Sequence, residues 1–494
     1  MSRDGDRRAA RESRRWALAR PAVVALLATL AVAATAGLAS AHELTAREFT
    51  APVPLPMVFA GAGATVGLTA LWLGVADRES TRSVDTAQDS PARTVASLQS
   101  HVVRPLSLAL RVGFLALFAG ALAHGLLGRQ VATANLATLV VWPLVLKGVG
   151  LLAIAVGSPW RVLSPWETCY DALVALEGRE LAIAGEYPDR LAAWPAVVGF
   201  VLGVGILENL TVATRSPATT VAVAAGYAAV MLLGAVMYGR TWFERADALT
   251  VLFDLLGRVA PLAVERTDAG GLAVGYRPPW VAVSRTLRDP SLVAFVVAAV
   301  YTVSFDGFTA TRTYRTLLAS ARDVLGVGLA SVTLYVVGLA AALVTFAAAA
   351  VLAEYLGRPT RVESAERTHS RRQAAAAAFG GTVVPIAAAY EVAHNYPFVA
   401  ANIGQTAGVL RALALGGDPH PVRPLAGLTV GAFWWSQVLL VVVGHLIAVV
   451  AAHRVATARY GPGTPSRRGH APFVLVMVGY TVLSLWIVSQ PIVG

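Results

Sequence analysis

The chain has 494 residues, of which 56% are hydrophobic and only 14% charged. Its mean hydropathy is +0.62, so it has too few polar residues to cover a soluble globule. The net charge of +11 comes from arginines in short segments between apolar stretches. This pattern is typical of cytoplasmic membrane loops and not of a nucleic-acid-binding surface.

Cysteine and lysine each occur once, and both exclude classes of function. The lone Cys169 excludes an internal disulfide, a thiolate-held iron–sulfur cluster and c-type haem attachment. The lone Lys147 is followed by glycine and not by serine or threonine. No phosphate-binding loop ending in Gly-Lys-Ser/Thr is therefore present, which excludes an ATP-driven pump of that type.

The amino-terminal segment has the pattern of a signal peptide. Seven arginines in the first twenty residues precede an apolar run at 21–38, and Ala39-Ser40-Ala41 follows. A basic segment, an apolar segment and an Ala-x-Ala site predict cleavage before His42. The alternative is an uncleaved first span, because the run is long enough to cross a membrane. We expect a leader at 1–41 and one membrane-embedded domain at 42–494.

Ten further apolar stretches have the roughly 20 residues that a bilayer core requires. They lie at 54–75, 105–126, 131–157, 192–213, 216–238, 291–308, 324–352, 374–400, 425–452 and 471–493. The eighth could continue beyond Pro397 as a re-entrant piece to about Leu415. The sequence therefore predicts an all-α polytopic bundle in the lipid bilayer, with about ten transmembrane helices in the mature chain.

The arginine distribution predicts the orientation. With the basic amino-terminus inside, thirty arginines fall on the inner side and eight on the outer side, not counting Arg111 within a span. The eight are Arg47, Arg129, Arg215, Arg312, Arg315, Arg322, Arg411 and Arg423. We expect a plasma-membrane protein whose mature amino-terminus and Gly494 both lie outside the cytoplasm.

Two inner loops have patterns of their own. In the loop at 239–290, apolar residues recur at helical spacing over 242–262 among charged ones. This predicts an amphipathic helix on the membrane surface. The segment 160–176 contains Trp160, Trp166 and Tyr170, which predicts an aromatic interfacial anchor.

Ionisable groups inside spans are costly, so each indicates a partner or a task. Counting residues from the predicted span ends places one group of them in the outer leaflet. This group comprises His124, Asn135, Glu208, Asp306, Tyr390, Glu391 and His394, and His42 would join it after cleavage. Each has a structural alternative. His124 could be an interfacial residue, Asn135 could satisfy backbone groups at a helix start, and Asp306 could cap or bend a span.

Lys147 and His445 fall in a second, inner layer by the same count. We therefore predict that Glu208, Asp306 and His394 converge near the outer face. We predict that the inner pair lies well removed from them. Carboxylates and imidazoles at one depth can bind a metal, relay protons or activate water.

Several motifs together resemble the polytopic membrane proteins of actinobacteria and archaea described as fenitrothion hydrolase-like. They are Asn135-Leu-Ala-Thr138, Trp160-Arg161-Val-Leu-Ser-Pro165-Trp166, Phe305-Asp306-Gly307-Phe308, Pro385 to Tyr390 ahead of Ala393-His394, and Gly444-His445 ahead of Ala452-His453. The resemblance covers most of the chain after Ala41. It implies hydrolysis of an organophosphorus triester, with Asp306, His394 and His445 as the functional positions. The chain departs from the family pattern at His42-Glu-Leu, at Glu391-Val-Ala-His394 and at Lys147.

The leading hypothesis is a membrane-embedded, metal-dependent hydrolase of phosphoester-like substrates. A divalent ion held by His394, Asp306 and His42 would activate water, with Glu208 or Glu391 as general base and Asp306 also at the catalytic centre. The alternative is a non-enzymatic membrane protein that binds or transports a metal ion or small solute. In a third interpretation the polar groups only pair with one another. We expect no nucleic-acid partner.

Overall fold

A computed structural model describes residues 54–76, 93–358 and 365–489. The predicted signal peptide and His42 lie outside the described residues. Within them, ten helical segments are long and apolar enough to cross a membrane, which confirms the all-α polytopic fold. They are Leu55–Gly74, Ser100–Leu127, Leu136–Val156, Asp189–Glu208, Pro217–Tyr238, Pro290–Thr309, Val327–Gly357, Ser370–Leu415, Val430–Tyr460 and Thr464–Ser489.

The outer surface of the bundle is strongly apolar. Large aliphatic and aromatic side chains on the spans are more than half exposed, among them Leu71, Trp72, Leu108, Leu233, Val344, Leu439 and Leu475. Such a surface would be unfavourable in water, but it matches the hydrocarbon core of a bilayer. The chain is a multi-pass membrane protein.

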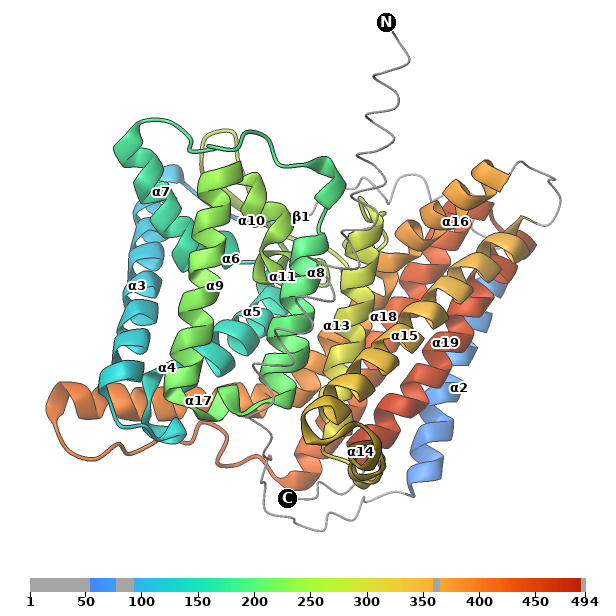
Figure 1. The fold of residues 1–494 in the computed structure, drawn as a ribbon. Coiled ribbons are helices and arrows are strands. Elements are labelled where there is room, and N and C mark those ends of the chain that lie inside the picture. Colours follow the sequence, from blue (N-terminus) through green and yellow to red (C-terminus); the bar gives the residue numbers. More distant parts are fainter. Residues whose placement is uncertain (1–53, 77–92, 359–364, 490–494) are drawn as a thin grey trace, which may run out of the picture.

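Two groups of helices meet at the helix α17, which lies between them (Figure 1). One group packs around α19, and the other packs around α9. Between them, α17 contacts the span of α4 and α5 on one side and α13 and α18 on the other. The first group is α2 (Leu55–Ala76), α15 (Val327–Gly357), α18 (Val430–Tyr460) and α19 (Thr464–Ser489); the second is α3 (Ser100–Leu127), α7 (Pro165–Glu177) and α9 (Pro217–Tyr238); the remaining helices are α4 (Leu136–Val140), α5 (Val149–Val156), α13 (Pro290–Thr309) and α17 (Val384–Leu415).

Alternate connections gather at opposite ends of the bundle, as the predicted topology requires. Figure 1 shows α7 and α10 (Thr241–Ala246) at the upper end and α14 (Arg312–Leu325) at the lower end. The upper end also carries a small antiparallel sheet in the order β1-β3-β2, which the sequence analysis did not predict. Its strands are β1 (Arg93–Leu98), β2 (Leu262–Arg266) and β3 (Leu272–Tyr276), with Val264 opposite Val274.

The eighth span is longer than predicted and is interrupted. The helix α16 (Ala365–Gly380) passes through one 3₁₀ turn, Gly381–Val383, into α17. A Cβ at Gly381 would lie 2.4 Å from the carbonyl oxygen of Val283, so glycine permits this close approach. Beyond Pro397, α17 continues without a break to Leu415 and crosses the lower end of the molecule in Figure 1. The stretch to Leu415 is therefore helical, but it continues the same helix and is not the separate re-entrant piece that was predicted.

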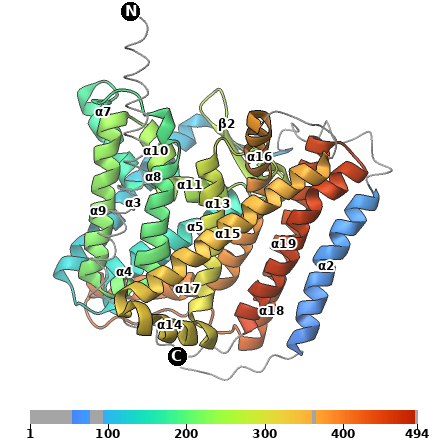
Figure 2. The ribbon, with the colours of Figure 1, turned by 45° about the vertical axis from the view of Figure 1, so that its right-hand side comes forward.

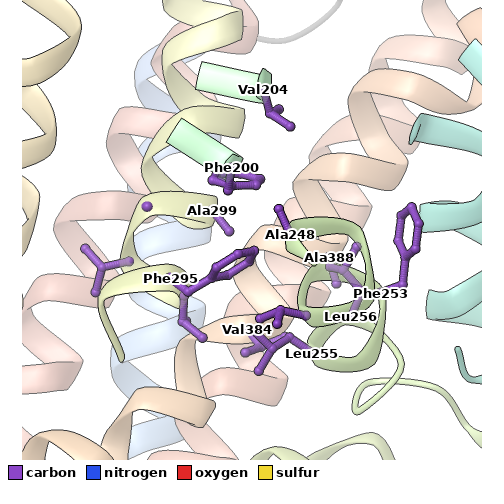
Figure 3. Close-up of a cluster of buried hydrophobic side chains, with 14 of the residues drawn as sticks. Phe200, Val204, Ala248, Phe253, Leu255, Leu256, Phe295, Ala299, Val384 and Ala388 are labelled. Carbon is purple, nitrogen blue, oxygen red and sulfur yellow. The ribbon is translucent and has the colours of Figure 1, made fainter. Parts of the chain in front are cut away.

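The predicted surface helix at 242–262 is wrong in its placement. The helix α11 (Ala248–Leu256) packs against α5, α8 (Trp194–Phe200) and α17, and Phe253 is fully buried. Figure 3 shows Phe253, Leu255 and Leu256 in one apolar cluster with Phe200 and Phe295. The helical period came from a buried face, which periodicity alone cannot distinguish from a lipid-facing one. The strongly amphipathic helix with an exposed polar face is α14 instead, with Arg312, Arg315 and Arg322 exposed.

The three aromatic residues of the interfacial anchor predicted at 160–176 are also buried and do not face an interface. Trp160, Trp166 and Tyr170 are each at most 2% exposed. Both indole nitrogens donate to the Asp247 carboxylate, Trp166 at 2.8 Å and Trp160 at 3.3 Å. These aromatics therefore connect α6 (Trp160–Leu163) and α7 to the start of α11.

Candidate functional site

Two of the predicted polar residues lie on π-helical segments of neighbouring spans. Lys147 is on η2 (Val141–Gly148), which joins α4 to α5, and Glu208 ends η4 (Val201–Glu208), which continues α8. A π-helix is rare because it widens the helical turn, and it occurs often at functional sites. Two of them in facing spans bring a lysine and a glutamate together inside the bundle.

The Lys147 ammonium lies between two carboxylates. Its Nζ is 3.3 Å from Oε1 of Glu208 and 3.8 Å from Oε1 of Glu391. The three side chains are only 7%, 12% and 9% exposed. Among the described residues, Oε2 of Glu208 is buried without a hydrogen-bond partner. Burying an ion in this environment costs free energy unless an opposite charge compensates it.

Asp306 and His394 form a second pair beside the first. Oδ2 of Asp306 is 3.4 Å from Nε2 of His394, and the side chains are 23% and 36% exposed. The predicted approach of these two residues is confirmed. The ring of Tyr390 stacks on that of His394, with centroids 6.2 Å apart and an interplanar angle of 25°. We call the set of Lys147, Glu208, Asp306, Glu391 and His394 the charged cluster.

A small cavity lies beside one member of each pair, Lys147 and Asp306. It has a volume of about 30 Å³, and polar groups of Lys147, Asn209, Asp306 and Glu391 line it together with apolar side chains. The side-chain nitrogen of Asn209 is buried without a hydrogen-bond partner among the described residues. This space suffices for a water molecule or a small ion, since one water requires roughly 10–15 Å³ of such volume.

The prediction that Lys147 lies in a separate inner layer is wrong. The apolar stretch predicted as a span begins at residue 131, but the helical span begins at Leu136. Lys147 is thus eleven residues into its span, at roughly 17 Å from the start. Glu208 is fourteen residues beyond Trp194, which begins α8. Lys147, near the middle of its span, therefore meets Glu208 at the end of a neighbouring span, so Lys147 lies with the carboxylates and not in a layer apart from them.

The other predicted residues have local structural roles or lie elsewhere. The side chain of Asn135 caps α4 by accepting a bond from Ala137 N at 2.9 Å, which confirms its structural alternative. Nδ1 of His124 accepts from Leu136 N at 3.2 Å in the same turn. His445 is 1% exposed on α18, where its Nδ1 lies 2.8 Å from the Val441 carbonyl oxygen.

The described residues do not complete a divalent metal site. No group of three or more His, Cys, Asp or Glu side chains with metal-binding geometry exists within residues 54–76, 93–358 and 365–489. Glu208 and Glu391 contact an internal ammonium, which supplies the positive charge that a metal would otherwise bring. His42, the third ligand in the sequence hypothesis, lies outside the described residues.

The sequence contained one signal for the cluster that counting depth obscured. Lys147 is the only lysine of the chain and stands inside an apolar span. An intramembrane cation requires an anion nearby, so Glu208 and Glu391 were its natural partners.

Comparison of the chain with models of known protein families, with curated proteins and with solved structures finds no match. The resemblance to the fenitrothion hydrolase-like family therefore stays a prediction from sequence motifs. The function has to be argued from the site.

Proposed function

We propose that the protein is a non-enzymatic membrane protein that binds and moves protons or small cations, with the charged cluster as its binding centre. The observation that supports this most is the Lys147 ammonium between two buried carboxylates, at 3.3 and 3.8 Å. Ionisable groups buried within spans mark ion paths and proton relays in membrane proteins. Here the charged cluster comes from four spans, and α17, which carries Glu391 and His394, packs against the spans of Lys147 and Asp306.

The charge of the cluster supports a role in cation binding. Three ionised carboxylates give −3, Lys147 gives +1, and His394 gives 0 or +1, so the sum is −2 or −1. An uncompensated negative charge in a low-dielectric interior is unfavourable. The cluster therefore holds one or two further protons, or it binds a cation. A cation that enters would compete with the lysine for the same carboxylates, which couples its binding to movement of the ammonium.

The size of the cavity favours a small ion over a larger solute. A volume of about 30 Å³ beside Lys147 and Asp306 is far below that of typical small-molecule pockets, about 300–1,000 Å³. A proton can pass between these groups through one water, and a small cation can replace that water. An organophosphorus triester would require the helices to separate.

We also propose the orientation in the membrane. The thirty-to-eight arginine asymmetry favours a plasma membrane in which the end with α7, α10 and the sheet faces the cytoplasm. The lower end with α14 then faces outward, as do Gly494 and the mature amino-terminus.

A metal-dependent hydrolase is the second candidate, and the Asp306–His394 pair favours it. These side chains are the most exposed of the cluster and are of metal-ligating types. The general bases of that hypothesis, Glu208 and Glu391, are instead paired with Lys147. Metal analysis of purified protein and an assay with an organophosphorus triester test this candidate. Stoichiometric metal that is lost in His394→Ala, together with hydrolysis, would support it over ion transport.

Ion flux into proteoliposomes tests the first proposal. Purified protein is reconstituted with an internal pH-sensitive dye, and a potassium gradient with valinomycin drives proton entry. Parallel samples contain external sodium and an internal sodium-sensitive dye. We expect flux above that of protein-free liposomes and its loss in Glu391→Gln and Asp306→Asn. The control is Glu354→Gln. Glu354 is a buried carboxylate on α15, outside the charged cluster, and it pairs with Arg459 at 2.9 Å. No flux of either ion, or equal flux in all variants, contradicts the proposal.

A further inference from the structure

A second, larger cavity lies at the upper end of the bundle, away from the charged cluster. It has a volume of about 290 Å³ and lies where the end of α11 meets β2, the residues after β3 and α12 (Pro279–Val283). Figure 2 shows β2 at this end, opposite α14. The volume is close to the lower limit of small-molecule sites.

Three arginines from different elements line this cavity. Arg258 follows α11, Arg277 follows β3, and Arg285 follows α12. Nη1 of Arg258 and Nε of Arg277 are buried without a hydrogen-bond partner among the described residues. Buried guanidinium donors are normally satisfied, so two arginines that each keep an unsatisfied nitrogen beside one cavity are suited to receive an anion there.

The local field at the cavity is positive. Burial and the neighbouring Arg288 lower the pKa of Arg258, and burial and Arg285 lower that of Arg277. Each guanidinium is thus in an environment that disfavours its charge, although arginine stays protonated at neutral pH. An anion between the two guanidinium groups would compensate the cost of burying their charges and reduce the repulsion between them.

Two carboxylates also line the cavity, and each favours the charge of one arginine, Asp254 that of Arg258 and Glu265 that of Arg277, but two carboxylates do not balance three arginines. Asp254 lies 3.7 Å from the guanidinium of Arg161, which is not part of the lining. Glu265 is exposed on β2. Asp254 is shared with Arg161, so the three lining arginines face Glu265 and only part of the charge of Asp254.

We propose that this cavity binds a phosphate-bearing anion. Guanidinium groups recognise phosphate oxygens through two parallel hydrogen bonds, and converging arginines are typical of phosphate sites. The place of the cavity at the end of the spans allows two sources: a phospholipid headgroup that enters from the bilayer, or a free phosphate ester from solution. Both present the same chemistry to Arg258, Arg277 and Arg285.

Thermal stability with inorganic phosphate tests the shared chemistry. Detergent-purified protein is heated with increasing phosphate, at constant ionic strength maintained with chloride. We expect a rise in the unfolding midpoint that saturates, with an apparent Kd at least about tenfold weaker in Arg258→Gln and in Arg277→Gln. The control is Arg266→Gln, an exposed arginine on β2 next to Glu265 that does not line the cavity. It should titrate as the unaltered chain does.

A variant that strengthens binding guards against loss of fold in the arginine variants. Glu265→Gln removes an exposed negative charge from the cavity wall, so phosphate should bind more tightly. Native mass spectrometry of protein reconstituted with phosphatidylglycerol distinguishes the two sources. A retained lipid that Arg258→Gln loses and Arg266→Gln keeps identifies a headgroup; phosphate binding without retained lipid identifies a free ester. If neither probe binds, or if binding is the same in Arg258→Gln, Arg277→Gln and Glu265→Gln, the proposal is wrong.

Discussion

Asp247 shows how one buried carboxylate organises its surroundings. The side chain is fully buried and accepts hydrogen bonds from Tyr227 Oη at 2.6 Å, Trp166 Nε1 at 2.8 Å, Thr250 Oγ1 at 2.9 Å and Trp160 Nε1 at 3.3 Å. It also caps α11 through Leu249 N at 2.9 Å. Because five donors point at its two oxygens, this position suits a carboxylate, which only accepts hydrogen bonds.

Asp247→Asn should therefore destabilise the protein strongly. The amide group would place donors against donors and leave at least two buried groups unsatisfied, at a cost of about 3 kcal/mol. Chemical unfolding in mixed micelles measures this loss. Asp189→Asn is the matched control, because Asp189 is 94% exposed in its pair with Arg245 and should change stability by less than about 1 kcal/mol. Equal effects would exclude the proposed role of Asp247.

Glu167 predicts a pH dependence outside the spans. Burial, and then the neighbouring Asp247, raise the pKa of Glu167 to about 8. Because the unfolded carboxyl titrates near 4.3, the folded state holds this proton more tightly. The contribution to stability is therefore unchanged below about pH 4 and becomes increasingly unfavourable up to about pH 8. Glu167→Gln should flatten this decline and be more stable than the unaltered chain at pH 8, but not at pH 4. A parallel decline in both proteins would contradict this account.

At the scale of elements, the sequence predicted the spans well and the packing poorly. All ten apolar stretches became spans because length and hydropathy are local properties. The environment of α11 was misread because a buried face and a lipid-facing face have the same period. The site was predicted in part: Asp306 and His394 meet at 3.4 Å, whereas Lys147 was assigned to the wrong layer. Pairing across spans depends on where each helix begins and on π-helical turns, which hydropathy does not indicate.

The buried placement of α11 predicts a large effect of truncating its core side chain. Phe253 is fully buried, with its ring centroid 5.2 Å from that of Trp160. Phe253→Ala should lower the free energy of unfolding by about 3–5 kcal/mol. Leu176→Ala, at a leucine that is 86% exposed on α7, should change it by less than about 1 kcal/mol. A surface helix would instead tolerate both substitutions equally.

At the scale of the whole molecule, the orientation is testable through Cys169. This free cysteine lies on α7, at the end that the arginine asymmetry assigns to the cytoplasm. A membrane-impermeant maleimide should not label it in intact cells and should label it once the membrane is opened. Burial raises the pKa of this thiol, so the reaction needs a mildly alkaline buffer in both samples. Labelling of intact cells would invert the topology.

The charged cluster is the centre of the account, and its central claim is that Lys147, Glu208 and Glu391 compensate one another as a unit. A double-mutant cycle on the free energy of unfolding tests this most directly. Lys147→Met leaves two buried carboxylates without their cation and should cost about 3–5 kcal/mol. Adding Glu208→Gln should recover much of that loss, giving a coupling of about 2 kcal/mol or more between the two positions. If the two substitutions add without coupling, the ammonium and the carboxylate do not compensate each other, and the cluster is not the binding centre proposed here.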